Sequence, residues 1–158
     1  MNDALAKLII VCGLPGSGKT TLARKLEKQM AAIRLCPDEW MDELAINLYD
    51  EAMRGKIETL QWKLAQKLLA HGSIVIIEWG TWGRAERDML RIKARELGAR
   101  VELYVLFAAL DVLYARIQCR GMENPPIKKE DIARWFEIFQ TPTSDEMALF
   151  DYAVTISS

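Results

Sequence analysis

Three glycines, a lysine and a threonine stand at fixed spacing close to the start of the sequence. The full stretch reads Gly13, Leu14, Pro15, Gly16, Ser17, Gly18, Lys19 and Thr20. It matches the pattern G-x-x-x-x-G-K-[ST], in which glycines let the backbone curl so that successive N–H groups point at phosphate oxygens. The lysine can reach the outer phosphates of a nucleotide, and the threonine hydroxyl can ligate Mg²⁺. Because the stretch follows a buried type of strand and opens an amphipathic helix, it predicts a phosphate-binding loop.

Two carboxylates follow apolar runs further along the chain, where open α/β sheets place their ligands. Asp38 comes just after the strand expected over 32–35, and Glu78 ends the run 74–77. At the position of Glu78, many P-loop proteins carry an aspartate that binds Mg²⁺. Glu78 is therefore a metal candidate together with Thr20. Both have alternatives. Asp38 also suits the N-cap of the helix that follows it, and Glu78 could cap a helix or hydrogen-bond an acceptor substrate.

Arg116 and Arg120 lie four residues apart on a helix expected over 110–120, so their guanidinium groups share one face. Positioned over a triphosphate, they would neutralise charge on the transferring group. The alternative is a solvated helix end with cations near its negative pole. A second arginine series is interleaved with acidic residues and is interpreted as a solvated face: Arg84, Arg87, Arg91 and Arg95.

Five tryptophans are many for a chain of 158 residues. Trp40, Trp79 and Trp82 are close in sequence to the two candidate carboxylates. They could wall an acceptor cleft and stack on a planar or sugar-like molecule, or they could pack between helix and sheet. Trp62 and Trp135 stand on expected helices and are assigned to packing.

Strand-like apolar runs alternate with helical patterns, which favours an α/β domain with a mainly parallel sheet covered on both faces. The expected strands cover 8–12, 32–35, 74–77, 101–107 and 153–156, and the expected helices cover 19–30, 51–71, 84–97, 110–120 and 131–139. Residues 121–129 contain two prolines and must form a loop, whereas Thr143 to Glu146 fits a capping box. Residues 1–158 are therefore expected to form one domain.

Composition excludes several classes of protein. Lys and Arg total 21 against 22 for Asp and Glu, and the net charge of -1 argues against a strongly basic protein that coats nucleic acid. The longest apolar run, residues 103–110, is far shorter than the roughly 18 residues that span a bilayer, so no membrane partner is expected. Three widely spaced cysteines indicate thiols in a reducing compartment and predict a cytoplasmic protein: Cys12, Cys36 and Cys119.

Together these segments resemble one group of P-loop kinases. The phosphate loop, the run Pro37-Asp38-Glu39-Trp40, Glu78 and the arginines Arg116 and Arg120 are similar to zeta toxins, chloramphenicol phosphotransferases and polynucleotide kinases. The resemblance implies a P-loop NTPase fold with a parallel sheet in the order 2-3-1-4-5, a small lid near residues 116–130, and ATP and Mg²⁺ as cofactors. It also implies that Asp38 accepts the proton of the attacking hydroxyl.

The sequence thus predicts an ATP- and Mg²⁺-dependent kinase that phosphorylates a hydroxyl of a small antibiotic-, sugar- or nucleoside-like molecule. A polynucleotide 5′-hydroxyl kinase is the alternative on the same fold, although the near-neutral charge argues against it. A nucleotide-binding regulator with slow ATPase activity is a third possibility, although it needs no base at Asp38. The candidate nucleotide-binding residues are Gly13, Pro15, Gly16, Ser17, Gly18, Lys19, Thr20, Thr21 and Arg120. The candidate catalytic residues are Lys19, Asp38, Arg116 and Arg120, and the expected acceptor pocket comprises Asp38, Trp40, Glu78, Trp79 and Trp82.

Overall fold

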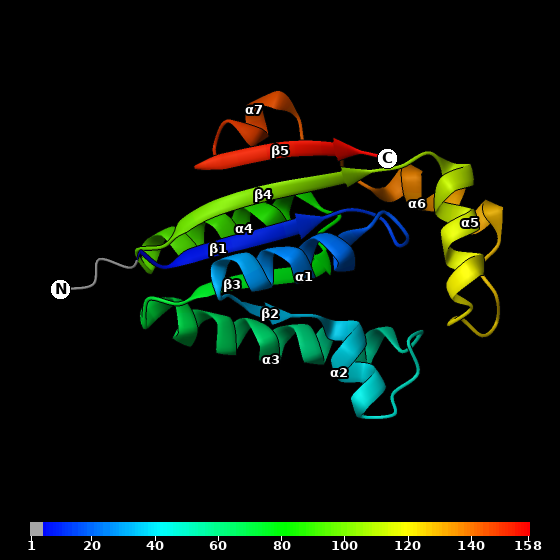
Figure 1. The fold of residues 1–158 in the computed structure, drawn as a ribbon, viewed down its shortest axis with the longest axis horizontal. Coiled ribbons are helices and arrows are strands. Elements are labelled where there is room, and N and C mark those ends of the chain that lie inside the picture. The colour runs from blue at the N-terminus through cyan, green and yellow to red at the C-terminus, as the bar shows by residue number, and fades with distance from the viewer. Residues whose placement is uncertain (1–4) are drawn as a thin grey trace.

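A five-stranded parallel sheet runs through the centre of the computed structural model, which describes residues 5–158 (Figure 1). Its strands are β1 (Lys7–Cys12), β2 (Ile33–Leu35), β3 (Ile74–Gly80), β4 (Arg100–Phe107) and β5 (Tyr152–Ser157). Their order is β2-β3-β1-β4-β5, and every neighbouring pair is parallel. Both the α/β fold class and the strand order expected from the sequence are confirmed.

The central strand β1 explains why the sheet is covered on both faces. Alternate residues of a strand point to opposite faces, and all of Leu8 to Cys12 are buried. Leu8 and Ile10 pack into one core, whereas Ile9 and Val11 pack into another. An apolar run without polar alternation therefore requires helices on both sides.

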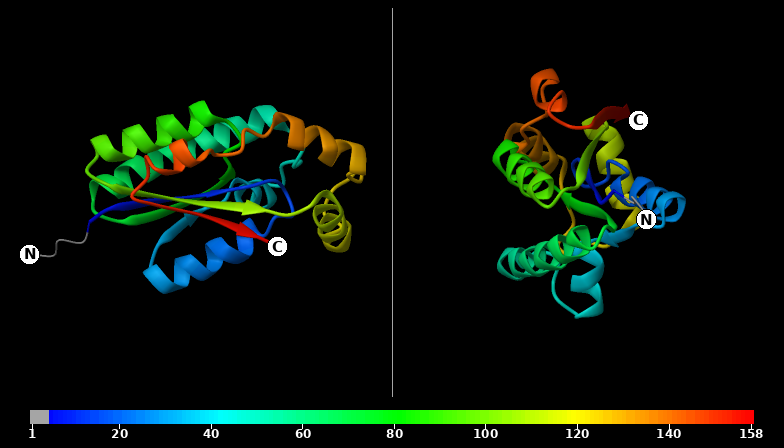
Figure 2. Two further views of the ribbon diagram at one scale, coloured as in Figure 1. Left: turned by 90° about the horizontal axis from the view of Figure 1, so that it is seen from above. Right: turned by 90° about the vertical axis from the view of Figure 1, so that its left-hand side faces the viewer.

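Seven helices surround the sheet in the described part of the chain: α1 (Lys19–Met30), α2 (Pro37–Glu43), α3 (Glu51–Ala70), α4 (Arg84–Glu96), α5 (Leu110–Arg120), α6 (Lys129–Ile138) and α7 (Ser144–Met147). Helices α3 and α4 lie on one face and α1 lies on the other (Figure 2). Helices α5 and α6 stand at the end of the sheet where β1 and β4 finish (Figure 1). This end is where a parallel sheet places ligands.

A third core connects the phosphate loop to α5 and α6. Leu14 of the loop packs with Leu113 and Ile117 of α5 and with Ile132 of α6. Ile127, which lies in the loop between those two helices, is buried in the same cluster. The segment expected to form a lid is therefore anchored on the loop that it would cover.

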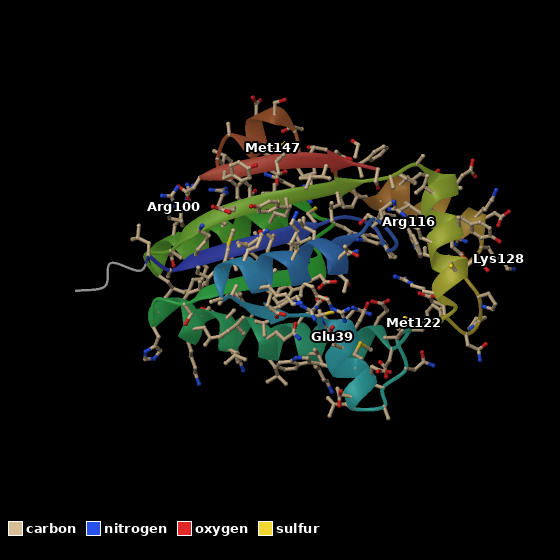
Figure 3. The ribbon with its side chains drawn as sticks, viewed as in Figure 1. Glu39, Arg100, Arg116, Met122, Lys128 and Met147 are labelled. Carbon is tan, nitrogen blue, oxygen red and sulfur yellow. The ribbon has the colours of Figure 1, made fainter. Side chains whose placement is uncertain are left out.

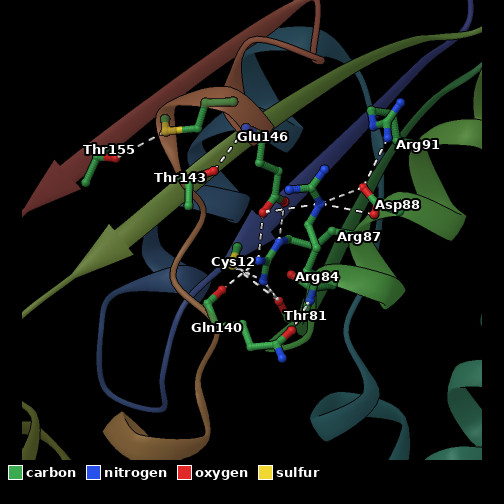
Figure 4. A network of polar contacts seen from close by, with 11 residues as sticks. Cys12, Thr81, Arg84, Arg87, Asp88, Arg91, Gln140, Thr143, Glu146 and Thr155 are labelled. Atoms are coloured by element: carbon green, nitrogen blue, oxygen red, sulfur yellow. Dashed lines mark hydrogen bonds and ion pairs between the residues drawn. The ribbon is translucent and has the colours of Figure 1, made fainter.

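The arginine series on α4 is not uniformly solvated, so the solvated-face interpretation is wrong for Arg87. Its side chain is 0% exposed, and its Nε lies 2.6 Å from Glu146 Oε2 of α7 (Figure 4). The predicted capping box forms only in part, because the Thr143 hydroxyl accepts from the Glu146 N–H at 3.2 Å while the Glu146 carboxylate pairs with Arg87. A charge buried at this depth must be paired, and α7 supplies the partner.

No helix within residues 5–158 combines the length and the apolar character that crossing a membrane requires.

Candidate active site

The phosphate loop joins β1 to α1, and its glycines are required by both conformation and contact. Gly16 and Gly18 have φ of 84° and 101°, values that side chains rarely adopt. A Cβ on Gly16 would also lie 3.1 Å from the carbonyl oxygen of Leu113 and 3.2 Å from Cγ1 of Ile117. Glycine at position 16 therefore allows the curled backbone and also lets α5 pack directly against it.

Lys19 lies at the first position of α1, and its Nζ donates to the Leu14 carbonyl oxygen at 3.0 Å. This hydrogen bond holds the ammonium group inside the loop. Burial lowers the pKa of Lys19, while the nearby carboxylates of Glu78 and Asp38 act in the opposite direction. The ammonium thus contacts the loop and lies within electrostatic range of both candidate carboxylates.

Glu78 stands near the end of β3 and bridges two other groups. Its Oε1 accepts from the Thr20 hydroxyl, and its Oε2 lies 2.8 Å from Nη1 of Arg34 on β2. The Arg34 side chain is almost fully buried and also donates to Glu39 at 2.5 Å. Arg34, which sequence reasoning did not single out, therefore fixes the orientation of Glu78.

The Thr20 hydroxyl and the Glu78 carboxylate suit Mg²⁺, which prefers oxygen ligands and commonly binds through one or two carboxylates, phosphate and water. The two oxygens are in direct contact, at the position where a triphosphate would meet the loop. Within residues 5–158, no group of three or more His, Cys, Asp or Glu side chains forms a metal cage. The residues fit a magnesium ion that is held mainly by the nucleotide.

Asp38 is the second residue of α2, and this position excludes the N-cap alternative. The N-cap is Cys36, Pro37 takes the first helical position, and no side chain caps the helix. The half-exposed Asp38 carboxylate instead accepts a hydrogen bond from Nη2 of Arg54 on α3. Sequence reasoning missed Arg54 because its contact depends on how α3 crosses α2.

Arg116 and Arg120 both reach the space beside the phosphate loop, as their spacing predicted. Nη1 of Arg116 donates to the Gly16 carbonyl oxygen at 3.1 Å, and Arg116 lies next to the loop in Figure 3. Nη2 of Arg120 lies 2.7 Å from Oε1 of Glu123. Both arginines are thus present at the cavity, one held by the loop and the other by the lid.

One cavity of about 560 Å³ brings most of the predicted site residues together. Its lining includes Pro15, Gly16, Gly18, Lys19, Thr20, Thr21, Asp38, Glu78, Trp79, Trp82, Arg116 and Arg120. Trp40 is not part of the lining and packs against the main core instead. The cavity thus runs continuously from the phosphate loop to Asp38 and the tryptophans.

Three tryptophan side chains line this cavity: Trp79, Trp82 and Trp135. The rings of Trp82 and Trp135 lie 6.1 Å apart, and Trp135 also lines the cavity, although the sequence assigned it to packing alone. Trp79 Nε1 donates to Gln61 Oε1 at 2.8 Å, which fixes the plane of its ring. Trp62 meets Trp79 edge to face and packs on the core, as predicted.

Several charged residues of the lining were not among the sequence candidates. Glu51, Arg54 and Glu58 come from α3, and Glu86 comes from α4. The three residues of α3 follow the spacing i, i+3, i+7, which places them on one helix face. The sequence contains this spacing, but the spacing alone does not show that this face of α3 lines the cavity.

The chain is similar to known phosphate-handling proteins over most of its length. A family model described as "AAA domain" matches residues 8–142. A gluconokinase from Arabidopsis thaliana is 28% identical over an alignment of 136 residues, and the match covers 78% of this chain and 71% of the relative. An adenylate kinase isoenzyme 6 homolog from Schizosaccharomyces pombe is 26% identical over an alignment of 153 residues, and the match covers 94% of this chain and 78% of the relative. The structure of Chaetomium thermophilum Kti12 in complex with ADP-AlF3 has a TM-score of 0.70 and 17% identity, covering 95% of this chain and 88% of that chain.

Proposed function

The chain belongs to the AAA domain family, and we propose that it transfers the γ-phosphate of ATP to a hydroxyl group of a small molecule. Its relationship to kinases makes it an ATP-dependent phosphotransferase in general terms. The hydroxyl acceptor is inferred from one observation: a single cavity contains both the phosphate loop and the Asp38 carboxylate. A site that only hydrolysed or sensed ATP would not need a cavity that extends past the phosphate loop to another carboxylate.

The phosphate half of the cavity would hold ATP. Backbone N–H groups of the loop and the Lys19 ammonium would bind the β- and γ-phosphates, with the α1 N-terminus adding its positive dipole end. Thr20 and Glu78 would hold Mg²⁺, which when bound neutralises charge on the β- and γ-phosphate oxygens. Arg34 supports this arrangement by holding Glu78 in place from the buried side.

The acceptor hydroxyl would enter between Asp38 and the γ-phosphate. Its oxygen forms a bond to the γ-phosphorus, the bond from that phosphorus to the β–γ bridging oxygen breaks, and Asp38 takes the hydroxyl proton. The products are ADP and a phosphate monoester. Because the transition state is loose, a carboxylate can orient the hydroxyl early and accept the proton late. Arg54 supports this role because it orients the Asp38 carboxylate.

Arg116 and Arg120 would stabilise charge on the transferring group, with residues 116–130 acting as the lid. We include in the proposal a single kinase domain over residues 1–158 and a cytoplasmic location, the latter supported by three cysteines without disulfides. A small-molecule acceptor is favoured over a polynucleotide because the acceptor half of the cavity is mainly acidic. Its charged lining residues besides Asp38 are Glu51, Arg54, Glu58 and Glu86.

The experiment is a transfer screen with γ-labelled ATP against sugars, nucleosides, amino alcohols and antibiotics. Lys19→Ala should lower turnover by roughly a hundredfold or more, because it removes an interaction that strengthens in the transition state. Lys25→Ala, at an exposed site on the same helix, is the matched control and should leave turnover unchanged. Label released only as inorganic phosphate with every acceptor would favour a nucleotide-binding regulator instead.

A further inference from the structure

The acceptor half of the cavity carries a pair of glutamates. Glu58 of α3 and Glu86 of α4 are both half-buried and line the cavity. Among residues 5–158, neither carboxylate has an ion-pair partner. Arg54 is the nearest candidate on α3, but its guanidinium is paired with Asp38. Half-buried carboxylates without a partner are costly, so this pair needs an explanation.

The two glutamates are close enough to influence each other. Burial and the neighbouring charge of Glu86 raise the pKa of Glu58 to about 7. Burial also raises the pKa of Glu86, against the opposing charge of Arg87. Arg87 cannot satisfy either of them, since it is bound to Glu146 at 2.6 Å on the buried side of α4. Both carboxyl groups thus line one open cavity, and Glu86 acts electrostatically on Glu58 there.

Thr81 supplies an independent observation on the same wall. Its residue is 1% exposed and lines the cavity, yet within the described part of the chain its hydroxyl has no hydrogen-bond partner. Its backbone is held rigidly, because the Thr81 carbonyl oxygen accepts from Nη1 of Arg87 at 2.7 Å and from Sγ of Cys12 at 3.4 Å (Figure 4). An unpaired hydroxyl on a rigid turn that lines the same cavity indicates a missing polar partner.

We propose that the acceptor half of the cavity recognises an alcohol that also carries a positively charged amine or quaternary ammonium group. Glu58 and Glu86 would neutralise the cation, and the faces of Trp79 and Trp82 would add cation–π attraction. An acceptor bearing a carboxylate or phosphate would instead place a further negative charge beside the glutamate pair. This inference rests on the proposed function, because it names the acceptor class of the same site.

The test is a binding comparison on the protein loaded with a non-hydrolysable ATP analogue and Mg²⁺. Choline carries a hydroxyl and a permanent positive charge, and the neutral alcohol in which carbon replaces its nitrogen has the same shape. Gluconate provides an anionic alcohol. Quenching of tryptophan fluorescence at about pH 8, where Glu58 is ionised, would give each dissociation constant, because three tryptophans line the cavity.

We expect choline to bind roughly tenfold more tightly than its neutral counterpart, with gluconate weakest. The double variant Glu58→Gln/Glu86→Gln should reduce the ratio between choline and the neutral alcohol towards one. Glu43→Gln, at an exposed site at the end of α2, should leave it unchanged. Analogue binding by each variant would show that it is folded.

A choline affinity no higher than that of the neutral alcohol, including no binding of either probe, would overturn the inference. A preference for choline that survives the double substitution would also overturn it. The proposed function is judged separately by the transfer assay. Selective choline binding without transfer to any alcohol would refute the kinase proposal alone, whereas transfer without a charge preference would refute only the cationic acceptor.

Discussion

The Asp38 carboxylate faces both the cavity and Arg54, and this double contact determines how it can act as a base. The ion pair fixes its orientation. In a loose transition state, the carboxylate would receive the proton only when transfer is well advanced. A capping role would have tied the same carboxylate to the backbone of α2, and the structure excludes that role.

Replacing Asp38 by Asn keeps the size of the side chain and removes the proton acceptor. We expect turnover to fall by roughly 10²- to 10⁴-fold while the Michaelis constant for ATP and the melting temperature barely change. Asp42→Asn, at an exposed site on the same helix, should leave turnover unaltered. Steady-state kinetics and thermal melts measure both effects, and a loss of stability in proportion to activity would point to a structural role.

Glu58 predicts a specific dependence of stability on pH. Burial and Glu86, with Glu51 and Asp38 adding smaller effects against Arg54, raise its pKa from 4.5 to about 7 in the folded protein. Between these values the folded state binds more protons than the unfolded state, so stability falls as pH rises through this window. Glu58→Gln should therefore raise the melting temperature at about pH 8 and change it little at about pH 4.

Glu43→Gln is the control for this measurement, since Glu43 is exposed and is the last residue of α2. Equal shifts of the melting temperature at both pH values would show that the Glu58 effect comes from packing rather than charge.

Helix α5 and the loop that follows it form the segment that we propose as the lid. Arg120 pairs with Glu123 in this same segment, so it can meet the γ-phosphate only by exchanging that partner. Arg120→Ala should lower turnover by roughly 10²- to 10³-fold and affect ATP binding much less, because the charge it stabilises grows during transfer. Arg134→Ala on α6, which carries another exposed ion pair, is the matched control. An unchanged turnover number with weaker ATP binding would assign Arg120 to binding alone.

Helix α7 has only four residues, yet it supplies the counter-charge for Arg87. Glu146→Gln would leave a fully buried guanidinium without an anion, which should lower the free energy of unfolding by about 3 to 5 kcal/mol. Asp145→Asn in the same helix is exposed and should cost far less. Chemical denaturation of the two variants compares them directly, and equal losses would contradict the importance of the buried pair.

These elements also show where sequence reasoning succeeds and where it stops. The phosphate loop and the alternation of strands with helices were predictable because a specific motif and local periodicity determine them. The strand order was expected from the resemblance to P-loop kinases alone. The burial of Arg87 was not, since it depends on Glu146 lying 59 residues away in the sequence. The contact between Arg54 and Asp38 likewise depends on the crossing of helices, which no local pattern encodes. The same holds for the presence of Glu58 and Glu86 in one cavity.

At the scale of the whole molecule, charge argues against nucleic acid as the acceptor. The net charge is -1, and the part of the cavity beyond Asp38 contains Glu51, Glu58 and Glu86 against Arg54 alone. We expect no measurable binding of short single-stranded DNA or RNA at physiological ionic strength and no labelling of its 5′ end. A fluorescence anisotropy titration at several salt concentrations checks this. Binding that weakens with a log–log slope of about -0.7 per neutralised phosphate would instead support a polynucleotide kinase.

The two halves of the cavity arise from different parts of the chain. In the proposed function, the nucleotide would contact the β1–α1 loop and α5, whereas the acceptor would contact α3 and the turn between β3 and α4. That turn is held from behind by Arg87, so its backbone stays in place when neighbouring side chains change. The enzyme is therefore a suitable scaffold for engineering: a mutant library confined to positions 51, 58 and 86 would explore new acceptors while leaving ATP use intact.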